Sequence, residues 1–417
     1  MAKIIKVVGR QVFDSRGNPT VEAEVFLSNK TKASAIVPSG ASTGTFEAYE
    51  LRDGNKDYFL GKSVLFAVKN INTIINKTLK KIDSGKQKKI DQVLLELDGT
   101  KNKKKLGANA LLAVSLAVSK VEAISKKKEL YQHLGGKFLL PKPLMNIING
   151  GAHADNNLRI QEFMIRPDSA KNFMEAIEKS FLVIQNLKKI LQSKNLSTNV
   201  GDEGGFAPLI NSNEEALDLV VDAIEKSKLK PGVDINICLD VAANELINKS
   251  GYYSLNSSKF ISVNDSINYY KDLVSKYPIK SIEDPFAEND WGAWSRLTKE
   301  IGKNVQIVGD DLFVTNVDRL KRGIKEKSAN SILIKVNQIG TLTETLDVID
   351  LAKKNNFSTI ISHRSGDTED TFIADLAVAT QSTQIKTGSL ARSERVAKYN
   401  RLLRIEEQLG KSSKIAR

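Results

Sequence analysis

Residues 331–364 read SILIKVNQIGTLTETLDVIDLAKKNNFSTIISHR, and this stretch decides the fold. Two short apolar runs flank the segment TETLDVIDLAKKNN, in which apolar residues recur at helical spacing. The first run ends at Lys335 and the second at His363 and Arg364. A strand, a helix and a second strand in this order form the repeating unit of a parallel sheet.

The same unit recurs through the second part of the chain. The runs VDINICLD, IKSIEDP, VQIVGDD and TQIKTG are of the same kind, and their charged ends are Asp240, Glu283, Asp310 and Lys386. From Glu283 onward, the charged ends follow one another at intervals of 27, 25, 28 and 23 residues, the length of one strand–helix unit. In a (β/α)8 barrel the strand ends converge on one face, where active sites are found. We therefore expect an α/β barrel of the TIM type with charged side chains gathered at its mouth.

The first part of the chain has a different pattern. The strand-like runs KIIKVVGRQVF and TVEAEVFL are separated by the turn DSRGNP, and two helical stretches follow, SVLFAVKNINTIINKTL and GANALLAVSLAVSKVEAIS. We expect an N-terminal α+β domain over residues 1–135 and a C-terminal barrel domain over residues 136–417, joined by HLGGKFLLPKP. A chain of 417 residues is long enough for two cores.

Composition narrows the class of protein. With 41% hydrophobic and 27% charged residues, the chain has the balance of a soluble globular protein. The net charge of +13 comes from scattered lysines, which favours a Lys-rich surface over a nucleic-acid site. Cys238, the single cysteine, excludes an internal disulfide and lies in an apolar run, so we expect a buried thiol. The longest apolar stretch, ALLAVSLAVSKVEAI, is too short to span a bilayer, and we expect a cytoplasmic protein.

The charged strand ends suggest a chemistry. Taken singly, a carboxylate after a strand is more often a turn former or helix cap than a ligand. Six successive charged ends are harder to explain in this way, because their burial without pairing would be costly. Three carboxylates, Asp240, Glu283 and Asp310, converge only if a cation offsets their repulsion, and oxygen donors of this kind suit Mg²⁺ or Mn²⁺.

The remaining strand ends supply a base and an anion site. Near a bound cation, Lys335 or Lys386 would have a depressed pKa and could act as a base. An imidazole, a guanidinium and a hydroxyl at positions 363–365 could form an anion site or a polar loop. Together with a metal they indicate proton abstraction beside a carboxylate in a phosphorylated substrate.

Two glycine-rich stretches add to this reading. VPSGASTGTFEAYELRDG, residues 37–54, could be a mobile lid that excludes water or an ordinary surface connection. NVGDEGGFAP, residues 199–208, brackets Asp202 and Glu203 with glycines. This segment could present a carboxylic acid to a ligand or form a plain turn with solvated acids.

A dense series of motifs resembles the enolases, the glycolytic phosphopyruvate hydratases. The motifs are DSRGNPT, VPSGASTG, NGGAHADNN, IQEFMI, GDEGGFAP, LDVAA, SIEDPF, GDDLFVTN, LIKVNQIGT, SHRSGDTEDT and ARSERVAKYN, in family order over nearly the whole chain. The resemblance implies an enolase-type barrel with an N-terminal capping domain. It also implies the reversible, Mg²⁺-dependent dehydration of 2-phosphoglycerate to phosphoenolpyruvate in glycolysis and gluconeogenesis.

The resemblance further implies roles for single residues. Lys335 would remove the C2 proton, and Glu203, assisted by Glu162, would help the C3 hydroxyl to leave. Lys386 would stabilise the intermediate. Substrate-binding residues would be His153, Gln161, Glu162, His363, Arg364, Ser365 and Lys386, with Arg364 and Ser365 on the phosphate. Asp240, Glu283 and Asp310 would hold the first Mg²⁺, and Ser39 would help to bind the second, which enters with the substrate.

The family pattern also carries expectations about partners. It implies a homodimer or a dimer-based octamer in the cytoplasm. The activity that it implies requires neither nucleic acid nor a membrane span. Display at the cell surface and secretion are left open. Asp367 stands where the family usually has Glu, and Ser389 and Leu390 replace small residues or proline. His133 matches no site motif and is taken as structural. The competing hypotheses are another lyase or a racemase on the same barrel, and a binding role of the basic surface for RNA or an anionic protein.

Overall fold

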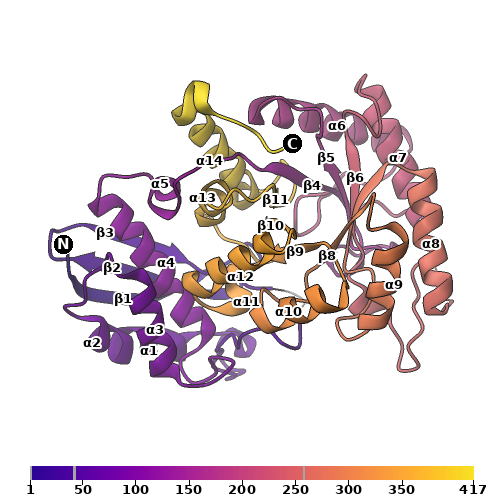
Figure 1. Cartoon of the computed structure of the whole chain (residues 1–417). Coiled ribbons are helices and arrows are strands. Elements are labelled where there is room, and N and C mark those ends of the chain that lie inside the picture. The colour runs from indigo at the N-terminus through magenta and orange to yellow at the C-terminus, as the bar shows by residue number, and fades with distance from the viewer. Residues whose placement is uncertain (1, 41–43, 257–258) are drawn as a thin grey trace.

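The structure is a computed structural model that describes residues 2–40, 44–256 and 259–417. A small sheet with its helices forms one end of the molecule, and a barrel ringed by helices forms the rest (Figure 1). The N-terminal sheet is antiparallel in the order β1-β2-β3, with strands β1 (Ile4–Phe13), β2 (Pro19–Leu27) and β3 (Lys32–Ile36). The two strands expected at residues 3–13 and 20–27 are thus confirmed.

Helices follow the N-terminal sheet along the chain. They are α1 (Leu65–Asn70), α2 (Asn76–Leu79), α3 (Gln87–Asp98), α4 (Ala108–Ser125) and α5 (Leu130–Leu134), and a π-helical turn (Ile71–Ile75) joins α1 to α2. Two asparagines attach this helical segment to strand β1. Asn72 in the π-helical turn accepts a hydrogen bond from the backbone N–H of Gly9 (2.8 Å), and Asn76 at the start of α2 accepts one from the backbone N–H of Val7 (2.9 Å).

Helix α4 is the core of this end of the molecule. It packs on β2 and β3 and also contacts α11 (Val336–Ile339) and α12 (Leu342–Lys354) of the barrel. The expectation that this apolar stretch is too short to span a bilayer is wrong, because the helix has 18 residues and its length and composition would allow it to cross a membrane. However, 83% of it is buried inside the protein. An apolar core helix accounts for this pattern. Helix α4 also connects the N-terminal part with the barrel through its contacts with α11 and α12. These two helices directly follow the strand that ends before Lys335.

The second part of the chain is a closed eight-stranded barrel in the order β10-β11-β4-β5-β6-β7-β8-β9. Its strands are β4 (Lys142–Asn149), β5 (Glu162–Arg166), β6 (Asn236–Asp240), β7 (Ile279–Glu283), β8 (Gln306–Gly309), β9 (Ser331–Ile334), β10 (Ser358–Ser362) and β11 (Gln384–Lys386). The six strands expected from the apolar runs, β6 to β11, are confirmed, and all of them are parallel to their neighbours within that set.

One strand departs from the regular alternation of strand and helix. Between β4 and β5 the described residues 150–161 contain a short 3₁₀ turn (Gly151–His153) in place of a long helix, and β5 runs antiparallel to both β4 and β6. As a result Glu162, the first residue of β5, pairs with Asp240, the last residue of β6. The reversal therefore places a residue from the start of a strand at the same mouth as the ends of the parallel strands.

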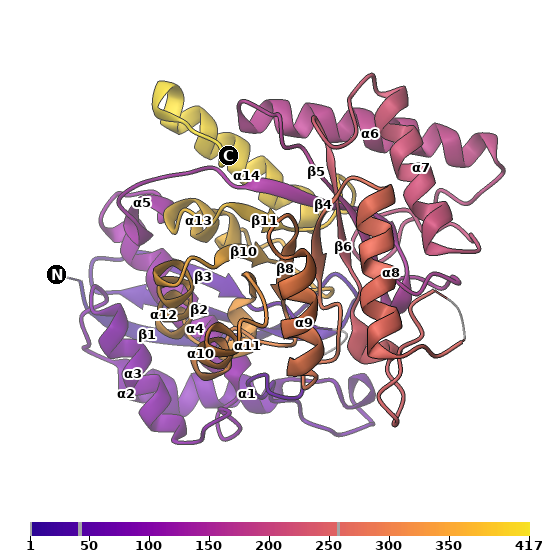
Figure 2. The ribbon, with the colours of Figure 1, turned by 45° about the vertical axis from the view of Figure 1, so that its right-hand side comes forward.

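Helices surround the barrel (Figure 2). Besides α11 and α12 they are α6 (Phe173–Ser193), α7 (Asn213–Lys226), α8 (Val263–Lys276), α9 (Trp291–Ile301), α10 (Val317–Glu326), α13 (Phe372–Ala379) and α14 (Ser393–Leu409). Many begin at a capping side chain: Ser212, Ser262 and Thr341 each accept a hydrogen bond from the backbone N–H three residues later.

The barrel interior is filled with apolar side chains. One cluster consists of Leu144, Met164, Cys238, Val308, Leu333 and Ile360, one residue from each of six strands. Cys238 is completely buried there, and burial raises the pKa of its thiol to about 12. The expected buried thiol is confirmed. The packed interior also fills the barrel below its mouth.

Candidate active site

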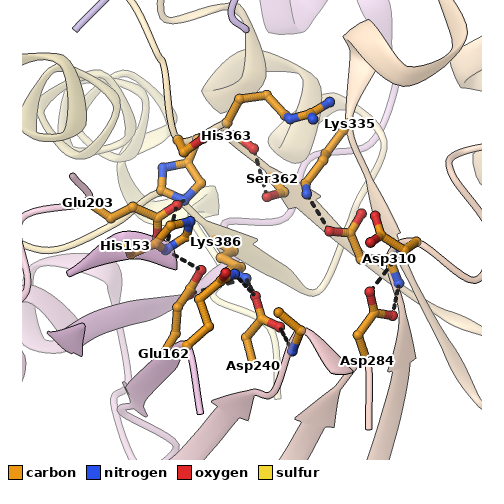
Figure 3. A pocket seen from close by; sticks show the side chains of 15 residues that line it. His153, Glu162, Glu203, Asp240, Asp284, Asp310, Lys335, Ser362, His363 and Lys386 are labelled. Atoms are coloured by element: carbon orange, nitrogen blue, oxygen red, sulfur yellow. Dashed lines mark hydrogen bonds and ion pairs between the residues drawn. The ribbon is translucent and has the colours of Figure 1, made fainter. Parts of the chain in front are cut away.

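A pocket opens at the mouth of the barrel, where the charged strand ends meet (Figure 3). It is lined by His153, Gln161, Glu162, Glu203, Asp240, Ala242, Asp284, Asp310, Asp311, Lys335, Ser362, His363, Arg364, Ser365 and Lys386. Of the residues predicted to have catalytic, substrate-binding or metal-binding roles, all but Glu283 and Ser39 line this pocket, and Glu283 contacts Lys386 at its base. The expected gathering of the strand ends is therefore observed.

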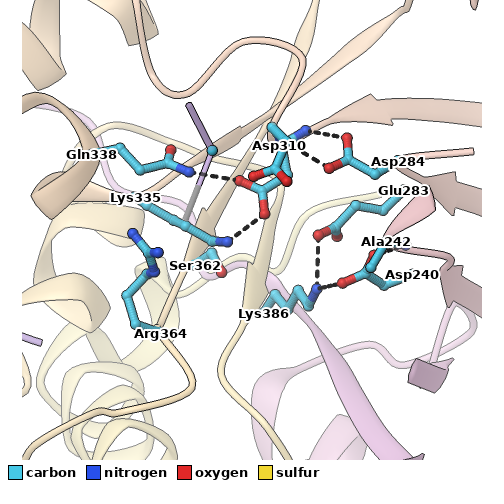
Figure 4. Close-up of polar contacts among 12 residues, drawn as sticks. Asp240, Ala242, Glu283, Asp284, Asp310, Lys335, Gln338, Ser362, Arg364 and Lys386 are labelled. Carbon is cyan, nitrogen blue, oxygen red and sulfur yellow. Dashed lines mark hydrogen bonds and ion pairs between the residues drawn. The ribbon is translucent and has the colours of Figure 1, made fainter. Parts of the chain in front are cut away.

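Lys386 is held among three carboxylates. Its Nζ lies 2.9 Å from Oδ2 of Asp240, 2.8 Å from Oε1 of Glu283 and 3.1 Å from Oε2 of Glu162. Burial lowers the pKa of Lys386, but the carboxylates outweigh burial and raise it well above its ordinary value. Lys386 is therefore a fixed ammonium ion at the mouth of the barrel (Figure 4).

Lys335 lies on the other side of the pocket and pairs with Asp310. Its Nζ donates to Oδ2 of Asp310, and Gln338 donates to Oδ1 of the same carboxylate at 2.9 Å. Burial lowers the pKa of Lys335, but Asp310 outweighs this effect and raises it. In this arrangement Lys335 carries a proton.

The backbone around Asp310 is fixed by a residue that the sequence reasoning missed. Asp284 accepts hydrogen bonds from the backbone N–H groups of Asp310 and Asp311, both at 2.9 Å. Its own backbone is left-handed (φ 41°), which is rare outside glycine and costs free energy. The sequence carried a signal for this contact, namely the adjacent acids in SIEDP and GDD. Of two adjacent carboxylates at a strand end, one can contact a lysine of the site while the other holds the backbone of the next strand end.

Two histidines and two glutamates form the far wall. Nε2 of His363 lies 3.2 Å from Oε1 of Glu203, and Nδ1 of His153 lies 3.5 Å from Glu162 and 3.8 Å from Glu203. Asn146 donates a hydrogen bond to Oε2 of Glu203 at 3.2 Å. The side chains of both histidines and both glutamates are buried. The protonation of each therefore depends on the protonation of the others.

The two glutamates differ in their tendency to ionise. Burial and the neighbouring Glu203 raise the pKa of Glu162 well above its ordinary value. Burial also opposes ionisation of Glu203, but His363 and His153 outweigh it and lower the pKa of Glu203. Burial lowers the pKa of the His363 imidazole to about 4. The carboxyl groups of Glu162 and Glu203 lie close together, so the ionisation of one depends on that of the other.

Glycines allow the loop carrying Glu203 to enter the site. A Cβ atom on Gly204 would lie 2.7 Å from the carbonyl oxygen of Ala391, and one on Gly205 would lie 2.3 Å from Oδ1 of Asn149. Gly204 also has a left-handed backbone (φ 83°). Glu203 is 3% exposed and lines the pocket, so this loop is a close-packed wall of the site.

The anion end is formed by residues 363–365 after β10. Arg364 is buried, and its guanidinium donates to Oδ1 of Asn337 (3.1 Å) and to both carboxylate oxygens of Glu47. Glu47 belongs to the glycine-rich segment 37–54 of the N-terminal part, so this segment contacts the barrel. Residues 41–43 of the segment lie outside the described residues. Its expected mobility remains a prediction.

Ser39 is not brought into this cluster. Its hydroxyl donates to Glu50 (3.0 Å) and accepts from Arg52 (3.1 Å), and its backbone forms a bridge with Gly366. The second-metal role of Ser39, which was expected only with bound substrate, stays a prediction. Gln161, in contrast, donates from Nε2 to Oδ2 of Asp240 at 3.3 Å, and its Oε1 is buried without a protein partner among the described residues.

The donor set fits a divalent cation. The lining residues include six carboxylates against the three cations Lys335, Arg364 and Lys386. Burial and neighbouring acids raise the pKa values of Glu283 and Asp284 well above their ordinary range, which shows that their charges are poorly compensated. Ligand atoms of Asp284, Asp310 and Asp311 lie within 4.8 Å of one another, as do those of His153, Glu162 and Glu203. Carboxylate oxygens of this kind are ligands for hard cations.

Lysines and carboxyl groups face one another across a pocket at the mouth of a closed barrel. This arrangement is typical of an enzyme that transfers protons on an anionic substrate. Comparisons with known proteins give the family. The model of the enolase N-terminal domain matches residues 4–134, and that of the enolase C-terminal TIM barrel domain matches residues 137–417. A curated relative, the enolase of Pelagibacter ubique (strain HTCC1062), is 63% identical over 419 residues, which cover 100% of both chains.

The chain therefore belongs to the enolase family. Its activity is that of a lyase, phosphopyruvate hydratase, which acts in glycolysis and interconverts 2-phosphoglycerate and phosphoenolpyruvate. The expected fold class, an enolase-type barrel with an N-terminal domain, is confirmed.

Proposed function

We propose that Lys335 removes the C2 proton of 2-phosphoglycerate and that Glu203, assisted by Glu162, protonates the departing C3 hydroxyl. The observation that carries this proposal is the placement of the two groups on opposite walls of one pocket. Lys335 follows β9 and contacts Asp310, whereas Glu203 lies among His153, Glu162 and His363. A substrate between these walls would present one face to a base and the other to an acid. Because neighbouring imidazoles lower the pKa of Glu203, the proton that it donates is proposed to come from Glu162, whose pKa is raised.

A lysine base has to be neutral when it accepts the proton. Among the groups that act most strongly on Lys335, burial, Arg364 and Lys386 lower its pKa. Asp310 and Glu283 raise it. Both of these carboxylates are proposed metal ligands, so their negative charge is the part that a cation would neutralise. Lys335 would then be left with the influences that favour its neutral form.

We propose Mg²⁺ as the metal, held by Asp240, Glu283 and Asp310. When bound there, the cation supplies positive charge that stabilises the second negative charge formed on the substrate carboxylate as the C2 proton leaves. Lys386, a fixed ammonium ion in contact with two of these ligands, contributes positive charge at the same place.

The phosphate is proposed to bind at Arg364 and Ser365. A buried guanidinium offers two parallel donors to a phosphate. His153, Gln161 and His363 line the same pocket and are proposed to contact the rest of the substrate. This assignment requires Glu47 to leave Arg364, since both would use the same N–H groups.

Turnover by the variants tests the assignment. With Mg²⁺ present, formation of phosphoenolpyruvate is followed by its ultraviolet absorbance in wild type, Lys335→Ala and Glu203→Gln. Loss of an acid or base group is expected to lower kcat by about 10²–10⁴-fold in each variant. A variant that keeps kcat within threefold of wild type would remove that residue from the mechanism. Lys327→Ala, on an exposed lysine after α10, is the control for loss of a lysine.

We further propose that residues 1–135 and 136–417 are separate domains, that the protein is a homodimer or a dimer-based octamer, and that it acts in the cytoplasm. The change from an antiparallel sheet to a closed barrel after α5 supports the boundary. The family membership supports the assembly, which light scattering coupled to size-exclusion chromatography would measure.

A further inference from the structure

Arg395 lies directly behind the anion end of the site and has no place in the mechanism above. It stands in the first turn of α14 and is completely buried. Its guanidinium uses all four terminal N–H groups: Nη1 contacts Nδ1 of His363 (2.5 Å) and the carbonyl oxygen of Arg364 (2.6 Å), and Nη2 contacts the carbonyl oxygens of Ser365 (2.7 Å) and Asp202 (3.1 Å).

The contact with His363 has a fixed direction. A guanidinium only donates hydrogen bonds, so Nδ1 of His363 has to accept through a lone pair. A neutral imidazole with an unprotonated Nδ1 carries its proton on Nε2. Nε2 is the atom that lies 3.2 Å from Oε1 of Glu203. The Nε2–H group of His363 therefore lies close to the carboxyl group of Glu203, although the two are not aligned for a hydrogen bond.

The same guanidinium also orients the partner of His363. By holding the carbonyl oxygen of Asp202, Arg395 fixes the residue next to Glu203, while its bonds to the carbonyl oxygens of Arg364 and Ser365 fix the anion end. One side chain thus connects two segments that lie about 160 residues apart in the sequence. Hydrogen bonds behind a functional imidazole set both its ring orientation and its tautomer.

We propose that Arg395 is a positioning residue that holds His363 as the neutral Nε2–H tautomer facing Glu203. This inference rests on the proposed function only in assigning Glu203 a catalytic role. The state of His363 itself can be measured without catalysis.

Asp367 completes the arrangement. Its Oδ1 accepts from Lys398 at 2.9 Å, and its Oδ2 lies 3.8 Å from Nη1 of Arg395. The carboxylate therefore compensates two buried cations on one face of α14. Burial opposes ionisation of Asp367, but Lys398 and Arg395 outweigh it and lower its pKa. Lys398 donates hydrogen bonds to Asp367 and to the carbonyl oxygens of Thr368 and Glu394, so it is a matched control for loss of a buried cation beside Asp367.

Nitrogen-15 NMR of histidine-labelled protein tests the proposal directly. The chain has only three histidines, and a His133→Gln variant simplifies assignment because His133 lies outside the site. In the wild-type enzyme at pH 7 we expect His363 to show an unprotonated Nδ1 and a protonated Nε2. An Nδ1–H tautomer or a cationic ring would overturn the proposal, and this measurement requires no variant to fold.

Variants then separate positioning from packing. We expect Arg395→Met to give mixed tautomers of His363. We also expect kcat to fall by about 10–100-fold, because a small misplacement of reacting groups has effects of this size. KM is expected to stay within about threefold of wild type. Lys398→Met is expected to keep the Nε2–H tautomer. An unchanged tautomer or kcat in Arg395→Met would overturn the proposal, as would the same spectral change in Lys398→Met.

The outcomes also distinguish this inference from the proposed mechanism. Suppose that Glu203→Gln kept full activity, and that His363 was the Nε2–H tautomer in wild type but not in Arg395→Met. The assignment of Glu203 as the acid would then be wrong, and the proposal that Arg395 sets the tautomer of His363 would stand. If Glu203→Gln lost activity but Arg395→Met did not, the inference would fall alone.

Discussion

Arg364 and Glu47 form a two-pronged ion pair between the barrel and the N-terminal domain. Nη1 of Arg364 donates to Oε2 of Glu47 at 2.8 Å, and Nη2 donates to Oε1 at 3.2 Å. The exposed fractions of the two side chains are 3% and 8%. Because a phosphate would need the same donors, Glu47 competes with the proposed substrate group.

Removal of this competitor is expected to favour substrate binding. In Glu47→Gln, the loss of the carboxylate charge is expected to lower KM for 2-phosphoglycerate by about three- to tenfold, equivalent to roughly 0.7–1.4 kcal/mol. Steady-state kinetics measures the change. Glu50→Gln is the control, since Glu50 lies in the same segment but pairs with Arg52. A KM that rises in Glu47→Gln would show that Glu47 supports the bound state.

Stability is expected to fall on the acid side of neutrality because of His363. Burial lowers its pKa from the ordinary 6.5 to about 4, and Glu203, Arg395 and Asp367 are the charged groups that face it. The unfolded chain therefore binds a proton as the pH falls through 6.5, while the folded chain does not until about pH 4. Stability is lost over this window, by roughly 2 kcal/mol between pH 7.5 and pH 5.

Urea unfolding at the two pH values measures this contribution. The loss of unfolding free energy is expected to be smaller in His363→Gln than in wild type by about the same amount, because glutamine does not titrate. If both proteins lost equal free energy, His363 would not be the group responsible.

Metal binding is expected to stabilise the folded protein through Glu283. Added Mg²⁺ at about 100 times its dissociation constant should stabilise wild type by about 2.7 kcal/mol, seen as a higher thermal midpoint. Glu283→Gln should lose most of this rise, and Glu300→Gln, on the exposed face of α9, should retain it. A full rise in Glu283→Gln would exclude Glu283 as a ligand.

The sequence predicted the regular part of the barrel because β6 to β11 are short apolar runs that end on charge. It did not predict β4 and β5. Strand β4 contains Pro143 and Asn146, which are unusual in a buried strand, and β5 runs against its neighbours. The apolar pattern of a strand does not encode its direction, which is set by the barrel as a whole.

The site shows the same division. Residues at strand ends, such as Lys335 and Lys386, were found from spacing alone. Glu47, Asp284 and Arg395 were missed because each acts through a partner far away in the sequence or through its own backbone shape. Ser39 illustrates the converse, since its motif gave no information about the contacts of its hydroxyl with Glu50 and Arg52.

Exchange of the C2 proton of 2-phosphoglycerate with D₂O, followed by proton NMR, tests the central claim most directly. Lys335 and Glu203 lie on opposite walls and are proposed to act in separate steps. We therefore predict that Glu203→Gln still exchanges the C2 proton but forms little phosphoenolpyruvate, and that Lys335→Ala loses both reactions. Exchange at the wild-type rate in Lys335→Ala would contradict the account.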